Sequence, residues 1–420
     1  MIGVFAGHSF LHTLFARSVA GRPGSQGRAD RVSPGRGHDF TPPSVWILAD
    51  HKLGHTTQSI GLADALGWPY EIKQLRFNRL QWLGNRLLGA GRLSLDRRRS
   101  QSIESPFPDL VIATGRAAAP VARWIGRQSA GRTRLVQMGR RGVHHRADAF
   151  DLSVVCGFFG LPNHAARIET LAPLTAIDDR ALAEAAAEWR DLFAGAPRPH
   201  VALLVGGSSS AHRLDASTAA GMVSQVQAWT RAAGGSLHVV TSPRTGAPAS
   251  AAMRAAMDPG SSDRFYEWRP RDPENPYRGC LAVADILVVT GDSESMIAEA
   301  AATSRALYLY PVPARAQGPR RRFQAWVAAR ANFRPRTHED ALRPRSGLNR
   351  MCARLIELGF VRPPRDLAEF HRRLVEAGHA RFFGDPVDAT PRRPLREFDV
   401  VAERVRSLFA VTPAGAEVRA

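Results

Sequence analysis

Residues 286–300 read Ile-Leu-Val-Val-Thr-Gly-Asp-Ser-Glu-Ser-Met-Ile-Ala-Glu-Ala, a strand-like run followed by a turn and a helix-forming run. The apolar β-type residues Ile286 to Val289 predict a buried strand. The turn of Gly, Asp and Ser after it directs unpaired backbone N–H groups and the positive end of a helix dipole to one point. This stretch therefore predicts an anion site at the end of a strand.

A second strand-to-turn unit lies upstream, where the apolar run 201–205 leads into Gly206-Gly207-Ser208-Ser209-Ser210. Two adjacent glycines allow a close backbone approach or a positive φ. Glu299, on the helix after the other turn, is placed to accept hydrogen bonds from sugar hydroxyls. Two such loops on one parallel sheet suit a diphosphate and the sugars on either side of it. The pair predicts a nucleotide-sugar site.

Acidic residues in the second turn would repel a diphosphate. We therefore expect the side chains of Asp292 and Glu294 to cap the helix or to face away. The backbone, with Ser293, Ser295 and Met296, would then contact the ligand. The alternative is that this turn is an ordinary helix cap with no ligand.

Two further loops offer chemical groups. Arg244 follows the strand at 237–241 and can pair with a phosphate in bidentate fashion, although one arginine among so many can also lie there by chance. His55, in the loop after the strand at 45–49, is a candidate general base because the pKa of histidine, about 6.5, suits neutral water. Asp50 is the second candidate. The alternative for His55 is a loop histidine with no chemical task.

Composition excludes several classes of protein. The 420 residues, 44% of them apolar, allow two or three globular domains, and no run approaches the ~20 apolar residues of a membrane span. Three scattered cysteines give neither a disulfide framework nor a metal cluster, and we expect a reducing cytoplasm. His144-His145 lacks partners at ligand spacing, so no metal is assigned. No Gly-x-Gly-x-x-Gly follows an apolar run, so a dinucleotide cofactor is not expected.

The net charge of +19 comes almost entirely from arginine, since Lys52 and Lys73 are the only lysines. This bias looks like a GC-rich bacterial coding sequence, and scattered solvated arginines explain most of the charge. Attraction to an anionic membrane or to a phosphorylated substrate is the alternative. No recognition helix or single-strand pattern supports nucleic acid. Neither lysine lies in a Walker loop or in a Tyr-x-x-x-Lys sequence.

Strands and helices alternate along the chain, twice over. This order predicts an α/β protein with two doubly wound, Rossmann-like domains that face each other across a cleft. The expected boundaries are 1–43 for a disordered extension or a wrongly assigned start (a transit peptide is the alternative), 44–195 for an acceptor domain, 196–365 for a nucleotide-sugar domain, and 366–420 for C-terminal helices packing across the joint and a tail.

The motifs resemble the plant elongated-mitochondria (mitochondrial fission factor) family and its bacterial relatives over roughly residues 45–385. The resemblance rests on these segments: Ala49-Asp50-His51-Lys52-Leu53-Gly54-His55 with Gln58; Leu204 to Ser208; Asn275-Pro276-Tyr277; Ala284-Asp285; Val289 to Met296; Glu299-Ala300; and Phe370-His371 with Leu374 and Glu376 to Gly378. More distantly, the arrangement is similar to GT-B glycosyltransferases, in which a Gly-Gly-Ser loop and a Ser-rich turn hold a uridine diphosphate sugar. Glu299 matches their ribose-binding Glu.

The resemblance implies a metal-independent, GT-B-like enzyme that binds a nucleoside-diphosphate sugar and transfers the sugar to an unknown acceptor. Asp292 and Glu294 depart from the enzyme pattern. The alternative is a non-catalytic adaptor of the fission-factor type that recruits a protein partner. We expect no cofactor beyond the sugar nucleotide, and a cytoplasmic protein, with peripheral contact to an anionic inner membrane left open.

Overall fold

The computed structural model describes residues 41–50, 53–83, 85–139, 149–159, 161, 164–209, 211–316, 318–331, 347–358, 360–361 and 364–410. The sequence interpretations of residues 1–40, His51, Lys52, His144 and His145 fall outside this part of the chain. No helix within it is both long and apolar enough to cross a membrane.

The first unit is built on a six-stranded sheet in which every neighbouring pair is parallel. Its order is β2-β1-β3-β4-β5-β6, with β1 Val45–Ala49, β2 Tyr70–Gln74, β3 Leu110–Thr114, β4 Arg134–Met138, β5 Leu152–Cys156 and β6 Arg167–Thr170. The helical segments of this unit are α1 Leu53–Leu66, η2 Arg79–Trp82, α2 Asn85–Leu88, α3 Ala119–Gln128 and η4 Gly157–Phe159. The central strands β1 and β3 are buried along their whole length, as expected for a sheet covered on both faces.

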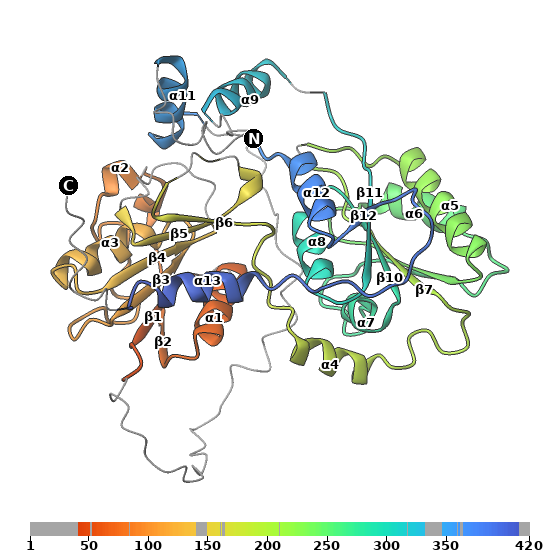
Figure 1. The fold of residues 1–420 in the computed structure, drawn as a ribbon, viewed down its shortest axis with the longest axis horizontal. Helices are drawn as coiled ribbons and strands as arrows, with labels where there is room; N and C mark the ends of the chain where they lie inside the picture. Colours follow the sequence, from red (N-terminus) through yellow and green to blue (C-terminus); the bar gives the residue numbers. More distant parts are fainter. Residues whose placement is uncertain are drawn as a thin grey trace, which may run out of the picture.

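The second unit carries another parallel six-stranded sheet, in the order β12-β11-β10-β7-β8-β9. Its strands are β7 His200–Leu204, β8 Ser236–Val240, β9 Arg264–Tyr266, β10 Ile286–Thr290, β11 Ala306–Tyr310 and β12 Arg381–Phe382. Its helices are α5 Ala216–Ala232, α6 Ala247–Ala256, α7 Tyr277–Val283 and α8 Glu294–Ala301, and α4 Asp179–Glu188 packs beside α7. Two doubly wound sheets confirm the predicted fold class, and Figure 1 shows the two units side by side.

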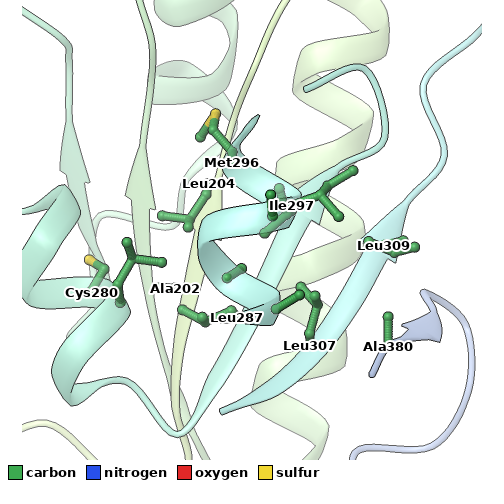
Figure 2. Packing of buried hydrophobic residues seen from close by; sticks show 14 of the residues in the cluster. Ala202, Leu204, Cys280, Leu287, Met296, Ile297, Leu307, Leu309 and Ala380 are labelled. Carbon is green, nitrogen blue, oxygen red and sulfur yellow. The ribbon is translucent and has the colours of Figure 1, made fainter. Parts of the chain in front are cut away.

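The core of the second unit explains why the quoted stretch folds as it does. Leu287 and Val289 of β10 pack against Met296 and Ile297 of α8 and against Leu204 of β7, all of them buried. Figure 2 shows this layer between helix and sheet. Because strand and helix bury their apolar faces against each other, the turn between them is held at the carboxyl edge of the sheet.

The C-terminal segment connects the two units. Helix α12, Leu367–Glu376, lies beside α8, whereas α13, Glu397–Arg406, returns to the first unit and lies beside α1 (Figure 1). The ring of Phe398 packs directly on Gly61, where a Cβ atom would come within 2.5 Å of it. Glu397 accepts backbone N–H groups of Leu171 and Ala172 at 2.6 and 3.0 Å. The remaining helices, α9 Pro319–Ala331 and α11 Gly347–Glu357, lie beside the first unit.

Candidate functional site

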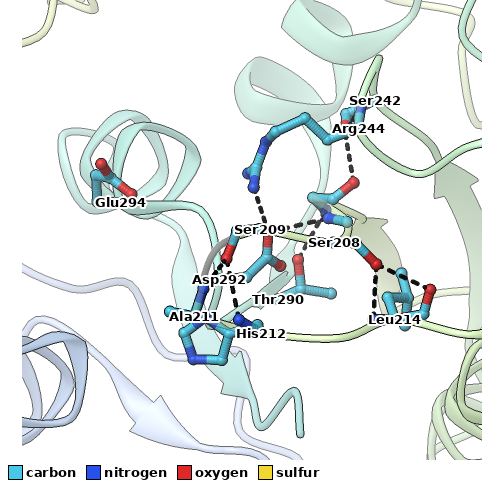
Figure 3. A network of polar contacts seen from close by, with 12 residues as sticks. Ser208, Ser209, Ala211, His212, Leu214, Ser242, Arg244, Thr290, Asp292 and Glu294 are labelled. Carbon is cyan, nitrogen blue, oxygen red and sulfur yellow. Dashed lines mark hydrogen bonds and ion pairs between the residues drawn. The ribbon is translucent and has the colours of Figure 1, made fainter. Parts of the chain in front are cut away.

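The carboxyl edge of the second sheet brings three loops together. Strands β10, β7 and β8 are neighbours, so the turns that follow them meet at one place. These turns carry Asp292, the pair Gly206-Gly207, and Arg244, and Figure 3 shows the side chain of Arg244 directed toward Asp292. The edge is where open parallel sheets bind ligands. The structure thus brings together these predicted ligand residues of the second unit.

The Asp292 carboxylate lies at the centre of this edge. Its side chain is fully buried, and its Oδ2 accepts the backbone N–H of Gly207 at 2.9 Å and contacts Arg244 Nη1 at 2.8 Å. The other oxygen, Oδ1, is buried and has no hydrogen-bond partner among the described residues. We expected Asp292 to cap the helix or to face away. It instead points into the glycine loop, where the buried N–H of Gly207 and the partly exposed guanidinium of Arg244 both donate to it.

The glycine loop can approach Asp292 only because it lacks side chains. A Cβ at Gly206 would fall 2.4 Å from Asp292 Oδ2, and a Cβ at Gly207, whose φ is +152°, would fall 2.1 Å from the carbonyl oxygen of Arg244. The N–H of Gly206 donates to Thr290 Oγ1 at 2.7 Å. Both glycine amides, which the sequence suggested as phosphate ligands, are therefore bonded within the protein.

The two serines after the glycines fold the loop upon itself. Ser208 Oγ donates to the carbonyl of Leu214 at 3.2 Å and accepts its N–H at 3.0 Å. Ser209 Oγ accepts the N–H groups of Ala211 and His212, both at 3.1 Å. These hydroxyls hold the shape of the loop in this structure (Figure 3). A ligand would reach them only after these bonds exchange.

The first turn of α8 is less occupied. Ser293 stands at the N-cap without a side-chain hydrogen bond to the helix, and Ser295 is exposed. Glu294 points away from the edge, as expected, and forms an ion pair with Arg365. Met296 packs its side chain into the core, so only its backbone belongs to the turn. Ser293 is only 3% exposed, so the positive end of this helix reaches solvent mainly near Ser295.

Glu299 does not lie open to a sugar. Its side chain is 6% exposed and accepts a hydrogen bond from the hydroxyl of Tyr277, on α7. Burial raises the pKa of Glu299 to about 7, although the bond from Tyr277 lowers it. Tyr277 and Glu299 both lie in segments of the family resemblance, but nothing in the sequence indicated that they pair. A ribose would have to displace the phenol to reach the carboxylate.

Glu299 should make the stability of the fold depend on pH. Its folded-state pKa of about 7 lies above the usual glutamate value of 4.5, so its contribution to stability is fully present below about pH 4.5 and is lost as the pH rises through 7. This contribution of Glu299 to the free energy of unfolding is of order 3 kcal/mol. In Glu299→Gln this part of the pH dependence should disappear, which urea unfolding between pH 4.5 and 7 would measure. An unchanged slope in the variant would contradict the assignment.

Two histidines near the edge were not predicted as site residues. His212 follows the glycine loop and His371 lies on α12, against Gly291. Their Nδ1 and Nε2 atoms, respectively, are buried without hydrogen-bond partners among the described residues. Burial lowers the pKa of His371 to about 4, and burial also lowers the pKa of His212. Both rings are therefore neutral near pH 7 and add no positive charge to the edge.

The candidate acid–base residues lie on the first unit. Asp50 is buried directly after β1. His55 lies in the first turn of α1, and its side chain falls outside the described part of the chain. Both follow β1, so they stand at the carboxyl edge of the first sheet. Their part in catalysis remains a prediction. No group of three or more His, Cys, Asp and Glu side chains in the described residues is placed to hold a metal ion.

Two cavities lie near these elements. One, of about 510 Å³, adjoins Ser208 and is lined by Arg213 and Arg315, by Thr218, and by Asp215, whose carboxylate pairs with Arg213. The other, of about 460 Å³, lies between α1, the segment 173–179 and the start of α13, and several carboxylates line it: Asp64, Asp178, Asp179, Glu397 and Asp399. An acidic cavity disfavours a phosphate, so the basic one beside the glycine loop fits the predicted ligand better.

Residues 53–357 match the mitochondrial fission ELM1 family. The chain belongs to this family. It is 34% identical to mitochondrial fission protein ELM1 of Arabidopsis thaliana over 140 residues, 33% of this chain and 32% of that protein, so it matches about a third of the length of that relative. It is 23% identical to an uncharacterized protein of Rickettsia prowazekii over 301 residues, 64% of this chain and 84% of that protein.

Solved structures resemble this ELM1-family chain weakly. The UDP-GlcNAc 2-epimerase of Methanocaldococcus jannaschii is 9% identical with a TM-score of 0.41, covering 87% of this chain and 99% of that chain. Arabidopsis thaliana UGT89C1 complexed with UDP-L-rhamnose is 12% identical with a TM-score of 0.38, covering 80% of this chain and 94% of that chain. Because these scores are low, the strand order of the two sheets defines the fold.

Proposed function

We propose that the carboxyl edge of the second sheet binds a nucleoside-diphosphate sugar, with the diphosphate taking the place of the Asp292 carboxylate. One observation supports this most directly: Arg244 and the Gly207 N–H converge on a single buried anionic group at a sheet edge. A carboxylate and a phosphate present similar oxygens to such donors. The first turn of α8, with the buried Ser293 and the exposed Ser295, would receive the second phosphate.

Sugar transfer is the finer part of the proposal. The acceptor would enter against the first unit, where His55 or Asp50 would remove its proton. Closure of the two units would bring the carboxyl edge of the first sheet toward the sugar nucleotide and exclude water. Glu299 would bind the ribose after Tyr277 releases it. The uridine nucleotide is the first candidate, since relatives by fold were solved with UDP-sugars.

A second candidate is supported by the same site. The Asp292 carboxylate already pairs with Arg244 and accepts the N–H of Gly207. The hydroxyl of Tyr277 already donates to Glu299. A site whose donors are bonded internally is stable without a ligand, which suits a non-catalytic adaptor. The family name, mitochondrial fission, is consistent with recruitment of a protein partner.

Calorimetry distinguishes the two candidates. UDP and UDP-sugars should bind the native chain, and Arg244→Ala should weaken binding by roughly tenfold or more because a charge-assisted contact to phosphate is lost. The matched control is Arg254→Ala, which removes an exposed arginine of the same unit that pairs with Glu267. Absence of heat with every nucleotide would refute nucleotide binding and favour the adaptor. If the UDP-sugars do bind, an assay for released nucleoside diphosphate separates sugar transfer from binding alone.

A further inference from the structure

Helices α9 and α11 form a strongly basic pair beside the first unit (Figure 1). They carry six arginines and a single acidic residue, Glu357: the arginines are Arg320, Arg321, Arg322, Arg330, Arg350 and Arg354. The pair therefore concentrates positive charge on one part of the molecule.

The same two helices expose large apolar side chains. Their inner face is anchored by Val327 and Ile356, both buried in one cluster with Val155 of the first unit. Beside these anchors the helices carry large apolar side chains that are about half exposed: Phe323 (54%), Trp326 (45%), Leu348 (41%) and Met351 (55%), with Phe360 (69%) just beyond. Arg330 lies 5.7 Å from the ring of Trp326. Apolar groups gathered this way mark an interaction surface.

A second apolar group lies at the same edge of the first sheet. Trp82, Leu87 and Leu93, in and after η2 and α2, are 80%, 75% and 68% exposed. This segment is fixed to the end of β3, since Asn85 donates to the carbonyl of Arg116 at 3.0 Å. The α9–α11 pair packs on Val155 near the end of β5. Because β3 and β5 flank β4 in a parallel sheet, both groups share its carboxyl edge.

We propose that this basic, apolar surface docks the protein on an anionic lipid bilayer. Arginine, tryptophan and aliphatic side chains together suit the boundary between headgroups and acyl chains. Charge attracts the surface to anionic lipid, and the apolar side chains enter the boundary. A nucleic acid would use the arginines and stacked rings but would leave Leu87, Leu93 and Met351 in water. The surface rests on contacts distinct from the nucleotide edge.

Vesicle sedimentation of the full chain tests the docking. The protein should sediment with vesicles of phosphatidylcholine and phosphatidylglycerol and remain in solution with phosphatidylcholine alone. Arg350→Gln/Arg354→Gln should weaken the partition by roughly fivefold for each arginine at low salt. Trp82→Ser/Leu87→Ser should abolish the binding that persists at high salt, because that part depends on apolar insertion.

The control replaces two exposed arginines of the second unit, in Arg264→Gln/Arg271→Gln, which should bind anionic vesicles like the native chain. If this control lost as much vesicle binding as Arg350→Gln/Arg354→Gln, the proposed surface would be wrong, since binding would then depend on net charge alone. Failure to sediment with anionic vesicles at low salt would also refute it. The proposal would also be refuted if a single-stranded oligonucleotide displaced the protein from the vesicles and if its own binding required Trp82. Circular dichroism of each variant establishes that the fold is kept.

Discussion

Alanine at position 207 is expected to destabilise the fold by about 3 kcal/mol or more, one of the largest effects of any single methyl group in this chain. The φ of Gly207 is +152°, a backbone conformation that residues with a side chain rarely adopt. The added Cβ would lie 2.1 Å from the carbonyl oxygen of Arg244. Relief would require the loops after β7 and β8 to separate. Urea unfolding of Gly207→Ala against the native chain measures the loss.

Gly221→Ala is the matched control for this prediction. Gly221 lies within α5, where a Cβ would meet no atom within 4 Å. Alanine should therefore stabilise the helix by about 0.5 to 1 kcal/mol. If both variants changed stability in the same direction and by similar amounts, the loop at Gly207 would not be packed as described.

Asp292→Asn should bind UDP at least tenfold more tightly than the native chain. The Asp292 carboxylate occupies the donors that a phosphate would use, and its charge would repel the phosphate nearby. Two unit charges 4 Å apart interact by about 4 kcal/mol at an effective dielectric constant of 20, so even a strongly screened effect exceeds tenfold. Asparagine keeps an acceptor for the Gly207 N–H. Calorimetry at matched salt measures the gain.

Two further variants show whether the gain comes from this edge. Asp258→Asn removes a different arginine-paired acid of the same unit, the partner of Arg231, and should leave UDP affinity unchanged. Asp292→Asn/Arg244→Ala should lose most of the gain, because Arg244 would make the new contact. Unchanged affinity in Asp292→Asn would mean that the diphosphate does not bind in place of the carboxylate.

Much of the fold could be predicted because its signals are local. β10, β7 and β1 are continuous apolar runs, which is the pattern of strands buried on both faces. The short strands β6, β9 and β12 were not predicted. All three lie at the edges of the sheets and are only partly buried, so few apolar residues mark them.

The sequence by itself determined which loops lie at the edge of the second sheet, because a strand followed by a turn and a helix fixes the position of the turn. Tertiary structure alone decided what those loops do to one another. Asp292 meets Gly207 across 85 positions and Tyr277 meets Glu299 from a different helix. No local pattern encodes such partners. They follow from sheet order, which places distant turns side by side. A buried carboxylate in one turn then binds the nearest donors of the neighbouring turns.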